Sequence, residues 1–149
     1  ASGLLKMSLP DMYEMNLGAN AIQDGFDIGN AFVAEVVATF ALQLVMFETM
    51  LHPSNRVGKN GPLAVGFVVF LVHGVLAPID NCSINPARSF GPAIVTNTWD
   101  DFWVFILAPA IGGLLAIPAH IAFLSDWGRG SKRRNAKGRN AGAQENESV

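Results

Sequence analysis

Hydrophobic residues along this chain gather in three long runs rather than at amphipathic spacing. The runs cover 29–51, 62–79 and 102–124. The first carries only two charges, Glu35 and Glu48, and the other two contain no Lys, Arg, Asp or Glu. Each run is long enough to cross the ~30 Å hydrocarbon core of a bilayer as a helix. Buried helices of a soluble core are the alternative, but a chain of 149 residues is too short to enclose three of them. The pattern predicts an all-α membrane protein.

A shorter, capped segment lies between the second and third runs. Asn is a preferred N-cap, and Pro is favoured at the first helical position, so Asn85-Pro86-Ala87 predicts a helix that begins at Pro86. The positions available to about Val95 give roughly 15 Å at 1.5 Å per residue, which is half of the hydrocarbon core. A half-length helix between full-length spans indicates a re-entrant element that lines a polar path. An ordinary N-cap in a surface loop is the alternative.

The distribution of charge predicts the topology. With three spans, the loop 51–61 and the segment after 124 lie on the same side of the membrane, and they hold eight of the ten Lys and Arg residues. The positive-inside rule places both in the cytoplasm and the acidic loops outside. The acidic residues assigned to those outer loops are Asp11, Glu14, Asp24, Asp27, Asp80, Asp100 and Asp101.

The tail 126–149 is expected to be a disordered cytoplasmic segment. Its basic residues could form a nucleic-acid patch, but their place beside the last span favours anionic lipid. We therefore expect the lipid bilayer and no nucleic acid as a partner.

Two side chains of the half-helix carry candidate chemistry. Asn85 can accept a backbone hydrogen bond through its oxygen while its amide points into a pore, where the positive end of the helix dipole orients water and disfavours cations. Arg88 is the only charged residue between Asp80 and Asp100, and a guanidinium within a membrane is costly unless it lines a wet cavity. It lies one turn after Asn85. A snorkelling or salt-bridged Arg is the alternative.

The segment 85–92, Asn-Pro-Ala-Arg-Ser-Phe-Gly-Pro, resembles the aquaporin (major intrinsic protein) family. Glu35, His73, Pro109 and the pair Gly112-Gly113 fall in the matching spans. The resemblance covers 1–125 and implies an aquaporin-like helical bundle. These residues would be the end of span three and spans four to six, with the re-entrant loop at 80–95. This is the C-terminal half of an inverted repeat.

The same resemblance implies several partners that this sequence does not contain. A first half with its own Asn-Pro-Ala motif is missing from the chain, whose first residues look like the end of an earlier apolar helix. The parent protein is expected to form a homotetramer in the plasma membrane.

The resemblance also assigns roles to individual residues. His73 and Arg88 would form the outer constriction of a water-selective pore, and Glu35 would accept hydrogen bonds from the re-entrant loop. Cys82 would line the constriction or act as a small apolar filler. The expected pore and selectivity residues are His73, Cys82, Asn85, Pro86, Ala87 and Arg88. The expected supporting residues are Glu35, Ser89, Ala93 and Phe105.

These residues predict a passive water channel that excludes ions and protons. His73 and Ser89 argue against the first alternative, a channel for glycerol or another small neutral solute, although the missing second aromatic at Phe105-Ile106 leaves secondary permeants open. A structural or adhesion protein with little conduction is the other alternative. No catalytic constellation stands outside the spans and no metal-ligand spacing appears, so we expect no enzyme, cofactor or metal. Glu48 is expected to be solvated, and His120 receives no role.

Overall fold

The computed structural model describes residues 1–9, 16–51 and 58–122, and the regular structure within them is helical. Helix α2 (Ile28–Met46) is continued by the π-helical turn η3 (Phe47–Leu51), and the 3-10 turn η4 (Gly58–Asn60) leads into α3 (Gly61–Asp80). The last long helix spans Val104–Ala122. Each of these three is long and apolar enough to cross a membrane, which confirms the predicted fold class. The tail 126–149 lies outside the described residues.

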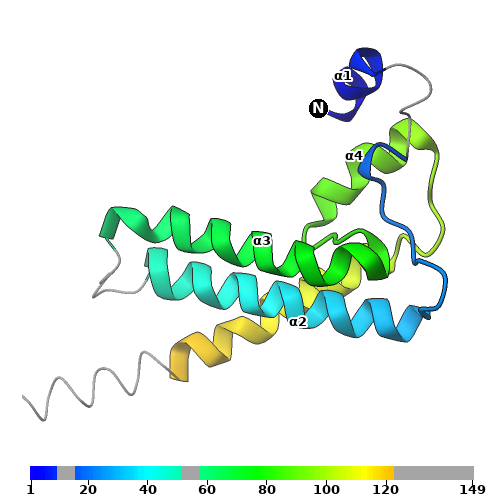
Figure 1. Cartoon of the computed structure of the whole chain (residues 1–149). Helices are drawn as coiled ribbons and strands as arrows, with labels where there is room; N and C mark the ends of the chain where they lie inside the picture. Colours follow the sequence, from blue (N-terminus) through cyan, green and yellow to red (C-terminus); the bar gives the residue numbers. More distant parts are fainter. Residues whose placement is uncertain (10–15, 52–57, 123–149) are drawn as a thin grey trace, which may run out of the picture.

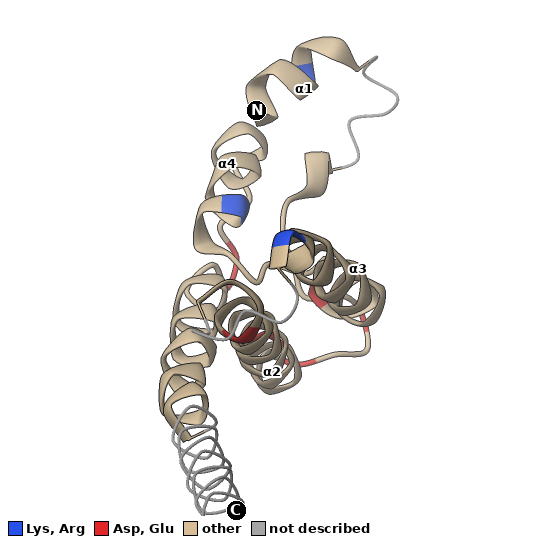
Figure 2. Cartoon of the chain, turned by 90° about the vertical axis from the view of Figure 1, so that its left-hand side faces the viewer, with Lys and Arg blue, Asp and Glu red and all other residues tan. Residues whose placement is uncertain are grey.

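Local sequence signals fix where α2 begins. Asp27 and Asn30 form a capping box, in which the Asp27 carboxylate accepts a hydrogen bond from the Asn30 amide at 2.7 Å. The Asn30 side-chain oxygen in turn accepts from the Asp27 amide at 3.1 Å. Beyond this cap, few charged residues occur along the long helices (Figure 2).

Proline and a left-handed residue delimit α3. The helix begins at Gly61, one residue before the predicted start, so Pro62 lies within the first turn. Its missing N–H costs nothing there because the first turn has no acceptors for these groups. The helix ends at Asp80 because Asn81 adopts a left-handed conformation with φ 68°.

Helix α2 packs against α3 on one side and against the last helix on the other (Figure 1). The last helix comes closest to α2 at Gly112, where an added Cβ would overlap the Val36 carbonyl oxygen and lie 3.0 Å from Thr39 Cβ. Small residues at such crossings let two backbones approach in a membrane. Gly112 is therefore a packing requirement of this pair.

The half-helix α4 (Pro86–Thr96) points away from the α2–α3 pair (Figure 1). Its 11 residues span about 16 Å, and Asn97 ends it in a left-handed conformation with φ 57°. Helix α1 (Ser2–Ser8) and the 3-10 turn η2 (Asn16–Gly18) lie next to α4. The predicted short helix between full-length spans is confirmed.

Candidate functional site

Asn85 begins the half-helix as an N-cap. Its backbone is extended, its side-chain oxygen accepts a hydrogen bond from the Ala87 amide at 2.9 Å, and Pro86 occupies the first turn. The oxygen is thus used inside the protein, and the NH₂ group donates no hydrogen bond within the described residues. Because Asn85 is exposed, this donor is available to a small molecule outside the helix.

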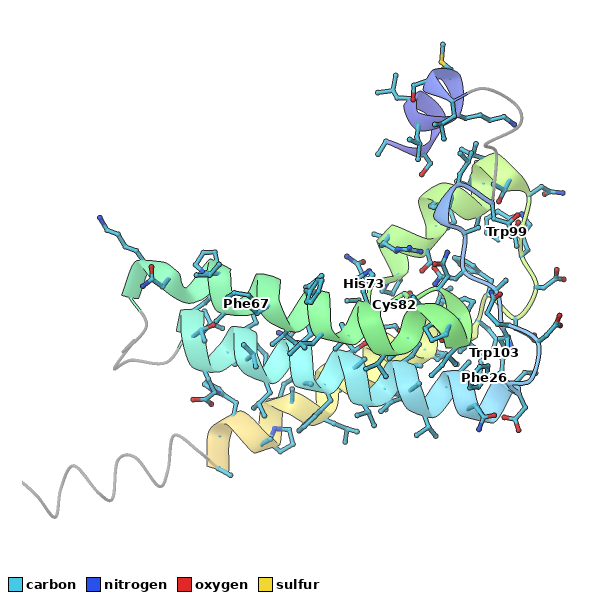
Figure 3. All side chains as sticks on the ribbon, viewed as in Figure 1. Phe26, Phe67, His73, Cys82, Trp99 and Trp103 are labelled. Carbon is cyan, nitrogen blue, oxygen red and sulfur yellow. The ribbon has the colours of Figure 1, made fainter. Side chains whose placement is uncertain are left out.

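One cavity of about 480 Å³ brings together side chains from all the helices around the start of α4. Four of the six predicted pore residues line it: His73, Asn85, Pro86 and Arg88. Helix α2 contributes Thr39 and Gln43, and the last helix contributes Pro109 and Gly113. Figure 3 shows His73 where α3 approaches α4. Residues of α2, α3, α4 and the last helix therefore form one wall of the predicted site.

The hydrogen bond of His73 defines which ring nitrogen donates a proton and which one accepts. Nδ1 lies 2.8 Å from the Val69 carbonyl oxygen one turn earlier. A carbonyl oxygen can only accept, so Nδ1 carries a proton and donates it there. In the neutral ring, Nε2 is then an unprotonated acceptor. His73 therefore has an acceptor nitrogen, and the residue lines the same cavity as Arg88.

Arg88 is held by the segment that precedes α2. Its Nη1 donates to the Gly18 carbonyl at 2.6 Å and to the Asn20 side-chain oxygen at 2.7 Å. The same Asn20 oxygen accepts from the Ser89 hydroxyl at 2.7 Å, and the Asn20 amide donates to the Asp80 carbonyl at 3.0 Å. Asn20 is buried. It therefore joins the loop, α3 and α4 around the guanidinium.

Sequence reasoning missed Asn20, which is among neither the pore nor the supporting residues that the sequence predicted. The Gly18-Ala19-Asn20 cluster indicates a turn. That signal says nothing about which side chain the Asn20 amide will contact, since Arg88 lies far away along the chain.

Glu35 is fully buried in α2 and holds the loop that leads into α4. Its two carboxylate oxygens accept hydrogen bonds from the backbone amides of Ser83 and Ile84, the latter at 2.7 Å. This is the contact that the resemblance implied. Ser89 extends the same network, because its proton goes to Asn20 and the Ser83 hydroxyl must then donate to Ser89.

Two acidic residues make contacts that the sequence did not predict. Asp80 was assigned to an outer loop, but it is the last residue of α3 and is fully buried, and its carboxylate accepts from the Cys82 amide at 2.9 Å. The loop folds back over α3 and covers it. Glu48 was expected to be solvated; its side chain remains partly exposed, and its Oε1 lies 2.7 Å from His120 Nδ1. That pair links η3 to the last helix.

The remaining predicted residues pack inside the protein. The Cys82 side chain is fully buried among Ala38, Leu76 and Ile84 and does not line the cavity of His73 and Asn85. Ala93 is buried in α4, and Phe105 is buried in the core between α2 and the last helix. Ala87 lines a second opening of about 610 Å³ beside α1 and η2. Across the described ranges, no three His, Cys, Asp or Glu side chains gather as metal ligands.

Comparisons with known proteins agree with this geometry. The family model described as "Major intrinsic protein" matches residues 1–120. "Probable aquaporin PIP1-5" of Arabidopsis thaliana is 42% identical over 127 residues, 80% of this chain and 44% of the relative. "Probable aquaporin PIP2-8" of the same plant is 38% identical over 126 residues, 79% of this chain and 45% of the relative. "Aquaporin-1" of Sus scrofa is 40% identical over 102 residues, 68% of this chain and 38% of the relative. The chain spans less than half the length of these relatives.

Proposed function

Because this chain belongs to the major intrinsic protein family of membrane channels, we propose that it forms the C-terminal half of a water-selective channel. The main observation behind this proposal is that His73, Asn85 and Arg88 line the same cavity. Members of this family are channels and not enzymes, and the apolar helices make the chain a multi-pass membrane protein.

Each polar group on the cavity has a defined role in this proposal. A water molecule at the constriction accepts from the Arg88 guanidinium and donates to His73 Nε2, so both of its hydrogen-bonding functions are matched. At Asn85, the free NH₂ group and the positive end of α4 draw the water oxygen. Single-file water is then reoriented, and cations meet the charge of Arg88 and the helix dipole.

The open side of the cavity needs a second wall. The proposal is that a first half with its own Asn-Pro-Ala motif closes this side, and that the whole assembles as a homotetramer in the plasma membrane. The loop 51–61 and the tail then face the cytoplasm. What supports the two-part pore is that the chain spans less than half the length of its relatives.

Osmotic swelling of vesicles tests this function. The chain is joined to the N-terminal half of "Probable aquaporin PIP1-5", its relative from Arabidopsis thaliana, and water and glycerol entry are measured by stopped-flow light scattering. We expect rapid water entry and no glycerol entry. His73→Ala removes the ring that narrows the cavity and should admit glycerol.

Phe70→Ala is the matched control, because Phe70 is an exposed aromatic on α3 away from the cavity. It should leave both rates unchanged. Equal entry of glycerol and water in the unsubstituted chimera would favour the neutral-solute alternative. Absence of water entry from a folded chimera would favour a structural role.

A further inference from the structure

Two carboxyl groups lie together beneath the loop that leads into the half-helix. Glu35 comes from α2 and Asp80 from the end of α3, and both are fully buried. The two carboxyl groups lie close enough to each other to interact. Each also accepts backbone amides of this loop: Glu35 those of Ser83 and Ile84, and Asp80 that of Cys82.

One oxygen of the pair lacks a donor. Asp80 Oδ2 is buried, and no donor reaches it from the described part of the chain. An ionised carboxylate can only accept, so two ionised groups in contact would leave this oxygen unsatisfied and would repel each other. A proton on one carboxyl changes this, because its O–H can donate to the other.

The charge balance of the site agrees with one proton. Arg88, the Cys82 thiol and the two carboxyls are the titratable groups that act on one another here. With a single proton shared, the pair carries one negative charge, which the guanidinium of Arg88 balances. With none, the buried cluster carries an uncompensated charge, which is costly in a low-dielectric setting.

We infer that Glu35 and Asp80 share one proton and that Asp80, through this hydrogen bond, is a positioning residue for the filter loop 82–85. The pair fixes the amides of Cys82, Ser83 and Ile84, and these set where Asn85 begins α4. Asp80 is also tied to the Arg88 site, because Asn20 donates to its carbonyl. Loss of the proton would separate the carboxyls and shift the loop.

Carboxyl ¹³C resonances of the labelled, reconstituted protein test this directly. At neutral pH we expect one protonated resonance from the pair, and we expect Asp80→Asn to remove it. Asp24→Asn is the matched control, since Asp24 is exposed before α2. If both Glu35 and Asp80 are ionised at neutral pH in the unsubstituted protein, the inference is overturned. This result comes from the unsubstituted protein and does not depend on the folding of any variant.

Water permeability gives a second measurement. Unlike the ¹³C measurement, it rests on the proposed function. As pH rises and the proton leaves, permeability of the unsubstituted chimera should fall. Asp80→Asn keeps an NH₂ donor toward Glu35 and an oxygen acceptor for Cys82, so its permeability should stay constant over the same range. A parallel fall in Asp80→Asn would contradict the positioning role. A protonated resonance in a protein that passes no water at any pH would overturn the proposed function alone.

Discussion

Arg88 owes its orientation to Asn20, a residue 68 positions earlier in the chain. One buried side-chain oxygen serves both the guanidinium and the Ser89 hydroxyl, and the attached amide reaches the end of α3. Arg88 is thus positioned by the segment before α2 and not by its own helix.

Asn20→Ala should remove one of the two acceptors of Arg88 Nη1, leaving the Gly18 carbonyl, and should take away the acceptor of the Ser89 proton and the donor to the Asp80 carbonyl. A hydrogen bond to a charged group contributes about 1.5–3 kcal/mol, so we expect a loss of that order in stability, measured by unfolding in detergent. The ratio of glycerol to water entry should rise in the same variant. Gln23→Ala lies in the same loop and removes only a bond to the Ala21 carbonyl, so both readouts should stay as they were.

The sequence could predict the residues whose signals are local. Asn85 and Pro86 are adjacent and together form the signature of a helix N-terminus. Glu35 was identified by the resemblance to the major intrinsic protein family. Asn20 and Asp80 escaped because their roles depend on a contact between residues 60 positions apart. An Asp after an apolar run looks like an exposed helix end, and only the folded loop shows that it is covered.

At the scale of elements, the apolar runs predicted the three long helices to within a few residues. Apolar length is a strong signal because a bilayer requires about 20 such residues in a row. The π-helical turn Phe47–Leu51 was not foreseen, since its residues continue the same apolar pattern. The pairing of Glu48 with His120 lies across this turn and the last helix, and neither run alone could indicate it.

Gly112 tests how closely α2 and the last helix approach. Gly112→Val would drive its side chain into the Val36 carbonyl and the Thr39 side chain. Overpacking of this kind costs about 1–3 kcal/mol, and thermal unfolding in detergent should report a lower midpoint. Gly66→Val serves as the control because nothing lies within 4 Å of a Cβ there. Equal effects of the two substitutions would show that the close crossing does not matter.

At the scale of the whole molecule, the outer side of α3 exposes large apolar residues. These are Leu63, Phe67, Phe70, Leu71 and Val75. Such a face is stable against lipid tails or another apolar helix. The sequence predicted that the helices span a membrane, but it could not show that their packing leaves the cavity of His73 and Asn85 open on one side, because that depends on the angle of α4.

The proposed topology places Lys59 and Asp24 on opposite sides of the membrane. In a Cys82→Ser background, which removes the only cysteine, Asp24→Cys should react with a membrane-impermeant maleimide on intact cells. Lys59→Cys should react only after the cells are permeabilised. The reverse pattern would invert the topology, and labelling of both on intact cells would contradict the span between them.

The loop before α4 depends on the helices beneath it for its conformation. Asn81, Cys82 and Ile84 all have positive φ, at 68°, 52° and 47°. Each such residue costs roughly 1–3 kcal/mol unless its surroundings enforce it, and Ile is a poor residue for this conformation. The loop therefore holds this conformation only while the contacts of α2 and α3 enforce it, above all the carboxylate of Glu35, which accepts two of its amides. If α2 and α3 separate, the loop is expected to relax and the start of the half-helix to lose its fixed place.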